Sequence, residues 1–176
     1  CYCKKDDSLF SEIECAGLCH DIAKLIDDNQ VRIKKKKKLN NKPFRHNEVG
    51  WAFLSKHLYT TNQLSKDNEL SKGRILHAIY WHHGIENEMG KNTDTEIYDL
   101  ISPDDLFILK QKLTELLKLI EGYTCSEEPI DDLYGNGYIN SPNFYLKTDS
   151  NSNNELRTFI RMCLITADRI VSAFTP

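Results

Sequence analysis

The amino-acid sequence predicts an all-α fold, a compact bundle of helices. Apolar residues recur at intervals of three and four along most of the chain, which is the period of an amphipathic helix. Segments with the alternating pattern of a β-strand are nearly absent. The 176 residues, 40% of them hydrophobic, suffice for one core of ordinary size. We therefore expect residues 1–176 to form a single domain.

Two helices are expected in the first third of the chain. Apolar spacing predicts a helix over residues 8–28 that either contains His20 and Asp21 or kinks at them. Residues 27–43 lose this periodicity and contain five consecutive lysines, whose mutual repulsion predicts a basic loop. Helical spacing then returns over residues 46–58, a segment that begins at a histidine.

Three further helices are expected in the rest of the chain. The first covers residues 70–83 and ends at two adjacent histidines. The second has the clearest signals, because Ser102 is a capping residue, Pro103 suits a first turn, and the amphipathic pattern continues to about residue 121. A turn-rich stretch follows, before a last helix that is capped by an asparagine near residue 153 and reaches Ala173.

Charge, cysteines and hydropathy limit the classes of partner and compartment. The net charge of -3 gives no basic signature for the whole chain, so contact with nucleic acid has to come from local clusters of Lys and Arg. Cys15, Cys19 and Cys163 fall in apolar helical patterns, where a reduced cysteine packs as a small hydrophobe. No apolar run reaches the ~20 residues that span a bilayer, and no signal peptide opens the chain. We expect a cytoplasmic protein.

Histidines and aspartates at predicted helix ends are the candidate chemical groups. His20 and Asp21 together offer an imidazole nitrogen and a carboxylate, which suit Mn, Fe, Co or Ni. His82 and His83 end a predicted helix, where two side chains can reach one cleft. Each pair alone is more often a pair without a metal. Together they carry more weight, because four of the six histidines (20, 46, 82 and 83) lie at helix edges in an order that matches a known pattern.

That pattern is the one of the HD superfamily of metal-dependent phosphohydrolases. The segment AGLCHDIAK (16–24) resembles its HD motif, FRHNEVG (44–50) its second-histidine segment, AIYWHHGI (78–85) its paired-histidine segment, and ITADRIVSA (165–173) its closing aspartate helix. The Arg-His start of the second segment and the tandem histidines look most like the HD nuclease domain of the CRISPR-associated nuclease-helicase of type I systems. This resemblance implies a helical HD bundle with its metal centre between helices.

The resemblance also implies roles for individual residues. Six ligands for one or two divalent ions (Mn, Ni, Co or Fe, with Mg also accepted) are implied: His20, Asp21, His46, His82, His83 and Asp168. Asp21 is expected to bridge two ions and to be catalytic, together with Lys24, which lies one helical turn after His20. A solvated helix-face lysine is the alternative for Lys24. Family members commonly carry another histidine before the HD motif, and this sequence has none there, so occupancy by one ion is an alternative.

Basic residues near the expected metal centre are the candidate DNA contacts. They are the five consecutive lysines and an arginine beside a proposed ligand: Lys34, Lys35, Lys36, Lys37, Lys38 and Arg45. Clustered positive charge binds phosphates and releases counterions, whereas a solvated loop and a surface salt bridge are the alternatives. The resemblance implies single-stranded DNA as substrate, with a helicase region of the same protein and the crRNA-guided surveillance complex as partners, and no membrane. The chain would then be a fragment of a longer nuclease-helicase.

The remaining histidines and the tryptophans lie outside these motifs. His57 and His77 fall in helical patterns, and positions on a helix surface or in the core are expected for both. Trp51 and Trp81 occupy apolar helical positions and are expected to pack in the core, with base stacking as the alternative.

Two other functions remain open beside the nuclease. A phosphohydrolase of small nucleotides, such as dNTPs or cyclic nucleotides, would need a closed pocket with groups that read the base. A degenerate HD module that acts in protein interaction would fit a chain lacking one ligand. The lysine run and the RHN and HH segments favour a polymer. We therefore expect cleavage of single-stranded DNA in CRISPR interference, by attack of a metal-activated water on the phosphodiester.

Overall fold

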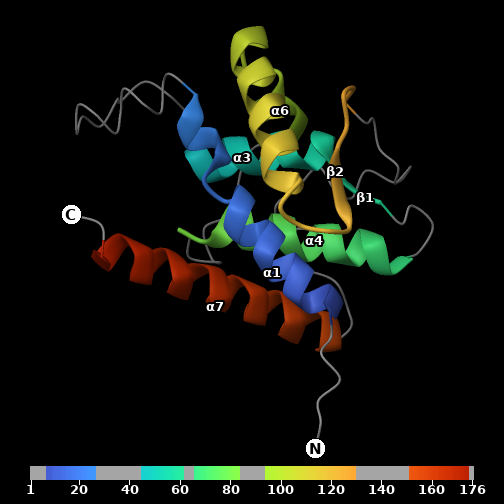
Figure 1. The fold of residues 1–176 in the computed structure, drawn as a ribbon, viewed down its shortest axis with the longest axis vertical. Coiled ribbons are helices and arrows are strands. Elements are labelled where there is room, and N and C mark those ends of the chain that lie inside the picture. The colour runs from blue at the N-terminus through green and yellow to red at the C-terminus, as the bar shows by residue number, and fades with distance from the viewer. Residues whose placement is uncertain (1–6, 27–44, 62–65, 84–93, 130–150, 175–176) are drawn as a thin grey trace, which may run out of the picture.

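A computed structural model of the chain describes five segments: residues 7–26, 45–61, 66–83, 94–129 and 151–174. Within these segments the predicted all-α fold is confirmed, and helices form the bundle shown in Figure 1. None of the described helices is both long enough and apolar enough to cross a bilayer.

The helices and strands follow one another in this order: α1 (Asp7–Cys19), the 3-10 helix η1 (Ile22–Leu25), α3 (His46–His57), β1 (Leu58–Thr60), α4 (Lys66–Trp81), α5 (Asp94–Tyr98), α6 (Pro103–Leu117), β2 (Tyr123–Cys125) and α7 (Asn151–Phe174). The two strands pair antiparallel, with Leu58 opposite Cys125. Every helix that the sequence predicts is therefore present. The short helix α5 and the two-stranded sheet were not predicted.

The predicted helix over residues 8–28 is interrupted, and the interruption lies at the two residues of the HD pair. Helix α1 ends at Cys19, and η1 begins at Ile22. The His20 side chain bonds to a carbonyl group of α1: its Nδ1 donates to the oxygen of Gly17 at 2.7 Å. In a continuous α-helix that oxygen would accept the amide of Asp21. The kink therefore lies where the sequence allowed one.

Two predicted helix ends differ from the observed ones. Helix α6 begins as predicted, since Ser102 Oγ accepts from the amide of Asp105 at 3.2 Å and Pro103 occupies its first turn. It ends at Leu117 rather than near residue 121, because the amide of Lys118 already bonds back to Glu115 with the tighter i to i−3 spacing. Helix α4 ends at Trp81, so His82 and His83 form a turn beyond it.

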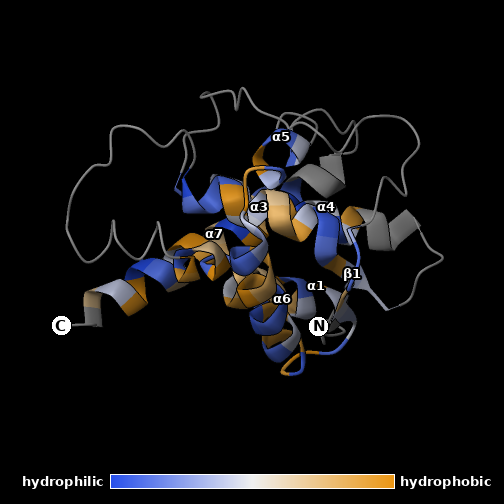
Figure 2. Ribbon diagram, turned by 90° about the horizontal axis from the view of Figure 1, so that it is seen from above, coloured by the Kyte–Doolittle hydropathy of each residue, from blue (hydrophilic) through white to orange (hydrophobic). Residues whose placement is uncertain are grey.

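Helices α3 and α4 form the centre of the bundle. Helix α3 packs against α4 and α5, and α7 lies across α4 and α1 (Figure 1). Trp51 is fully buried and Trp81 is 2% exposed, so both occupy the predicted core positions. Apolar and polar residues alternate along α7 in Figure 2, as expected for a helix that buries one face. This packing brings the end of α4, the start of α3, the kink after α1 and one face of α7 to a common place.

The cysteines of the described segments are all free thiols. Cys15 and Cys19 are buried on α1, and Cys163 is partly buried on α7, as predicted for cysteines in helical packing positions.

Candidate metal centre

The structure brings together all six residues that the sequence predicts as metal ligands. They come from four segments: His20 and Asp21 from the turn after α1, His46 from the first turn of α3, His82 and His83 from the turn after α4, and Asp168 from α7. Their ligand atoms form two groups, in each of which the atoms lie within 4.8 Å of one another. We call them the histidine cluster (Asp21, His46, His82 and His83) and the carboxylate cluster (His20, Asp21 and Asp168).

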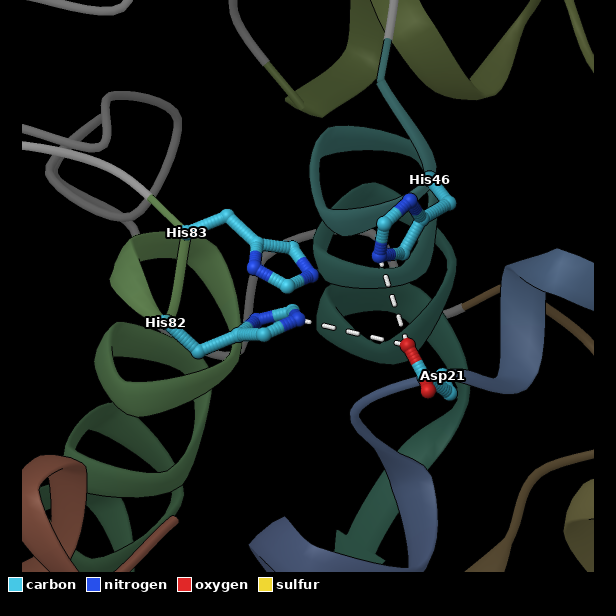
Figure 3. Close-up of side chains that lie close together, drawn as sticks. All are labelled: Asp21, His46, His82 and His83. Carbon is cyan, nitrogen blue, oxygen red and sulfur yellow. Dashed lines mark ion pairs between the residues drawn. The ribbon is translucent and has the colours of Figure 1, made fainter. Parts of the chain in front are cut away.

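Asp21 belongs to both clusters and presents a different oxygen to each. Its Oδ1 lies 3.3 Å from Nε2 of His46 and 4.0 Å from Nε2 of His82, as the dashed lines in Figure 3 mark. Its Oδ2 lies 3.2 Å from Nε2 of His20 and 2.6 Å from Nζ of Lys24. His20 completes the second cluster, since its Nε2 also lies 3.7 Å from Oδ1 of Asp168.

Hydrogen bonds of the main chain fix the orientation of two of these imidazoles. His82 Nδ1 donates to the carbonyl oxygen of Ile79 at 2.6 Å, and His20 Nδ1 donates to that of Gly17 at 2.7 Å. A carbonyl oxygen only accepts, so the proton of each neutral ring is on Nδ1. The lone pair on Nε2 of each ring then points into the centre, which is the orientation of a metal-binding histidine.

The atoms at the centre lack the partners that buried polar atoms normally have. Nε2 of His20, His46 and His82 and Oδ1 of Asp21 are buried without a hydrogen-bond partner. Lone pairs therefore converge on one space, and an unsatisfied buried polar atom costs about 1–3 kcal/mol. A cation removes this cost, so a divalent metal fits the residues present. Imidazole and carboxylate donors suit transition metals in particular.

The protonation states of the centre also suit a cation. Burial by itself raises the pKa of Asp21, but the close contacts with His20 and His46 and the ion pair with Lys24 hold that pKa well below its ordinary value. Burial, helped by the neighbouring histidines, lowers the pKa of His82 to about 3. Asp21 is therefore ionised and His82 neutral at neutral pH. These are the forms that bind metals.

The remaining predicted site residues have different placements. Lys24 contacts the centre through its ion pair with Asp21. Arg45 is exposed directly before His46, and its amide donates to Glu48 Oε2 at 2.7 Å. The lysine run, Lys34 to Lys38, lies outside the described residues, so its contact with DNA stays a prediction.

Sequence reasoning missed two residues that hold the helices of the centre together. Asn47, next to His46, is buried, and its Nδ2 donates to the carbonyl oxygen of Tyr80 at 2.6 Å. Arg161 donates from Nε to the carbonyl oxygen of Trp81 at 3.1 Å. A polar residue adjoining a proposed ligand was the available signal for Asn47. For Arg161 the signal was its position two helical turns before Asp168.

In this all-α bundle, histidines and aspartates from the ends of three helices and from within α7 converge on a site that can hold a divalent metal. The sequence matches the HD domain family over residues 7–122, which is more than half of the chain. The chain therefore belongs to the HD domain family, whose members are typically metal-dependent phosphohydrolases that bind divalent ions. No curated protein and no solved structure gives a significant match. The matched segment includes five of the predicted ligands but not Asp168.

Proposed function

We propose that this HD domain is a metal-dependent nuclease that hydrolyses phosphodiester bonds of single-stranded DNA. One observation supports the hydrolytic centre above all others. Asp21 offers one carboxylate oxygen to each of two adjoining clusters, and the Nε2 atoms around it are buried without hydrogen-bond partners. A carboxylate shared by two cation sites would hold two ions near each other, and paired ions can stabilise both the attacking and the leaving oxygen of phosphoryl transfer.

The two clusters have separate tasks in this proposal. Asp21, His46, His82 and His83 would hold one ion, and His20 and Asp168 would share Asp21 to hold a second. When bound, the ions supply activation of a water and neutralise the charge that builds on the phosphate. The protein orients the rings of His20 and His82, since the main-chain carbonyls of Gly17 and Ile79 accept hydrogen bonds from their Nδ1 atoms and leave Nε2 to face the ion.

Positive charge beside the clusters would bind the phosphate. Lys24 Nζ lies 2.6 Å from Asp21 Oδ2, and its side chain is 34% exposed, so Lys24 lies between the centre and the surface. Arg45 and His83 are exposed as well. Substrate would therefore approach from the side where these residues meet solvent.

The choice of DNA rests on the resemblance of the RHN and HH segments to the CRISPR-associated nuclease-helicase, and on the positive charge of the lysine run. In that setting the substrate would be the strand displaced by the crRNA-guided surveillance complex. A helicase region of the same protein would feed the strand to the centre in the cytoplasm. These partners remain part of the proposal.

The proposal is tested by metal content and cleavage on the same preparation. Labelled single-stranded DNA is incubated with the protein and Mn²⁺, Co²⁺, Ni²⁺ or Mg²⁺, and Asp21→Asn is compared with the wild type. Asp104→Asn is the matched control, because Asp104 is an exposed carboxylate on the first turn of α6. We expect metal-dependent cleavage that is lost in Asp21→Asn and retained in Asp104→Asn.

Other outcomes would lead to other conclusions. Hydrolysis of dNTPs or cyclic nucleotides without cleavage of DNA would replace the nuclease with a small-nucleotide phosphohydrolase. A folded protein that binds none of the four ions would leave the protein-interaction module as the function. Cleavage that persists in Asp21→Asn would show that the activity belongs to a contaminant or to another site.

A further inference from the structure

Helix α7 lies outside the segment that matches the HD domain family, yet two of its side chains reach the framework of the metal centre. Asp168 Oδ1 lies 3.7 Å from His20 Nε2. Arg161 precedes Asp168 by seven residues, which is two helical turns, so both side chains leave α7 on one face. Arg161 Nε donates to the carbonyl oxygen of Trp81 at 3.1 Å. One helix thus contacts both the kink after α1 and the end of α4.

The carbonyl group of Trp81 lies at the end of α4, directly before two of the proposed metal ligands. Trp81 is the last residue of α4, and the two histidines of the histidine cluster follow it directly. The last four carbonyl groups of a helix have no partner inside the helix and need one elsewhere. His82 Nδ1 supplies a donor to Ile79, and Arg161 supplies one to Trp81. The backbone turn that carries His82 and His83 is therefore held by hydrogen bonds at two points.

The charge of Arg161 also suits this position. A helix carries a partial negative charge at its carboxyl end, and a guanidinium group placed there is favourable. The contact is partly buried, so water competes with it less than it would on an open surface. A neutral side chain of similar length at position 161 would lose the charge and would shift or lose the donor.

We propose that Arg161 is a positioning residue of the metal centre: it fixes the turn after Trp81 so that His82 and His83 hold their Nε2 atoms toward Asp21. This inference rests on the proposed metal centre and adds a determinant of its affinity. Loss of a group that orients a metal ligand typically costs about 10–100-fold in metal affinity. We expect a loss of about tenfold, because Arg161 acts on the backbone of the ligands and not on the rings themselves.

The experiment follows Co²⁺ binding by its visible absorption, which reports the geometry and donors of the ion and needs no substrate. Arg161→Gln is compared with the wild type and with two controls on the same helix. Arg169→Gln makes the same change of charge at an exposed position. Ile160→Ala removes a fully buried apolar side chain next to Arg161, and so loosens the packing of α7 without touching the carbonyl of Trp81.

We expect Arg161→Gln to weaken Co²⁺ binding about tenfold and to alter the absorption bands. Arg169→Gln and Ile160→Ala should bind Co²⁺ within about twofold of the wild type, although Ile160→Ala should unfold at a lower temperature. The inference is overturned if Arg161→Gln binds like the wild type, or if Ile160→Ala loses as much affinity as Arg161→Gln, since Arg161 would then act only through packing. If the wild type itself binds no Co²⁺, the proposed metal centre falls and this inference falls with it.

Discussion

The two ends of helix α3 carry histidines in opposite situations. At the first residue, His46 Nε2 lies 3.3 Å from Asp21 Oδ1 and is buried without a hydrogen-bond partner. At the last residue, His57 is fully buried and both ring nitrogens are engaged. Its Nδ1 donates to the carbonyl oxygen of Ser126 at 2.8 Å, so its Nε2 accepts from the hydroxyl of Tyr98, also at 2.8 Å.

This difference separates a histidine with a structural role from one that can bind a metal ion. The protein completes the hydrogen bonds of His57 by itself, so His57 ties α3 to α5 and to the segment after β2. The protein leaves the Nε2 atoms at the other end incomplete and directs them at one space. A buried polar atom without a partner is costly, so several of them around one carboxylate form a site that can hold a cation.

The largest expected effect is on metal affinity at the start of α3. His46→Ala should lower the affinity of the histidine cluster by at least about 100-fold, because losing even a partner of a metal ligand costs about 10–100-fold. Calorimetric titration with Mn²⁺ or Co²⁺ measures this. The free energy of unfolding of the metal-free protein should change by less than about 1 kcal/mol, since His46 makes no complete hydrogen bond through Nε2. Unchanged affinity would remove His46 from the ligands.

The reverse pattern is expected at the other end of α3. His57→Ala should lower the free energy of unfolding by about 3 kcal/mol, since it opens a cavity and leaves the Ser126 carbonyl and the Tyr98 hydroxyl without this partner. Urea denaturation measures the loss. Metal affinity in the same variant should stay within about twofold of the wild type. A parallel drop in metal affinity would mean that the two ends of α3 are coupled, and the comparison would fail.

A third histidine, His77, should make the stability of the protein depend on pH. Burial, helped by the charges of Arg157 and Arg161, lowers the pKa of His77 to about 2, compared with 6.5 for an ordinary histidine. The folded state therefore accepts only the neutral ring. The contribution of the neutral His77 ring to the free energy of unfolding is complete above pH 6.5. It is lost as the pH falls from 6.5 toward 2, because the unfolded chain then binds a proton that the folded protein does not. Between pH 7 and 5 the loss should be about 2 kcal/mol.

Urea denaturation of the metal-free protein at pH 7 and pH 5 tests this dependence. His77→Gln should be less sensitive to pH than the wild type by that amount, because glutamine does not titrate. Equal sensitivity in both proteins would show that His77 is protonated without cost in the folded state.

The smallest expected effect lies beside the centre, at Lys24. Lys24→Gln should reduce the rate of DNA cleavage about tenfold, as for one charged contact to a phosphate oxygen worth roughly 1.4 kcal/mol. Metal affinity should fall by less than about threefold, since Lys24 contributes no ligand atom. Cleavage rates at saturating metal measure the effect. If affinity falls as much as the rate, Lys24 serves only to hold the carboxylate of Asp21.

Much of the centre could be predicted from the sequence because its residues lie at places with strong local patterns. His46 begins a helix, His82 and His83 follow the end of another, and His20 lies at a kink. The hydrogen bonding of each imidazole ring could not be predicted from the sequence. Whether Nε2 is satisfied depends on main-chain carbonyls and on residues far away in the chain, such as the pairing of His57 with Ser126.

The fold was predictable to the extent that it depends on helical periodicity. Helix α5 has only five residues, too few to show a period, and its position depends on distant contacts. Asp94 at its start accepts from Ser55 Oγ at 3.0 Å, and Tyr98 at its end meets His57. The strands β1 and β2 have three residues each and exist through their pairing with each other. Such elements are specified by tertiary contacts, which no local pattern reveals.

The position of Asp168 on α7 has a consequence for the time at which the centre is completed during synthesis. His83 and Asp168 are separated by 85 residues in the sequence. At about 5–20 residues per second, a ribosome needs roughly 4–17 s to cover that distance. The histidine cluster can assemble from the emerging chain during this interval, whereas the carboxylate cluster cannot. A nascent chain therefore carries an incomplete centre until α7 has been made and has docked.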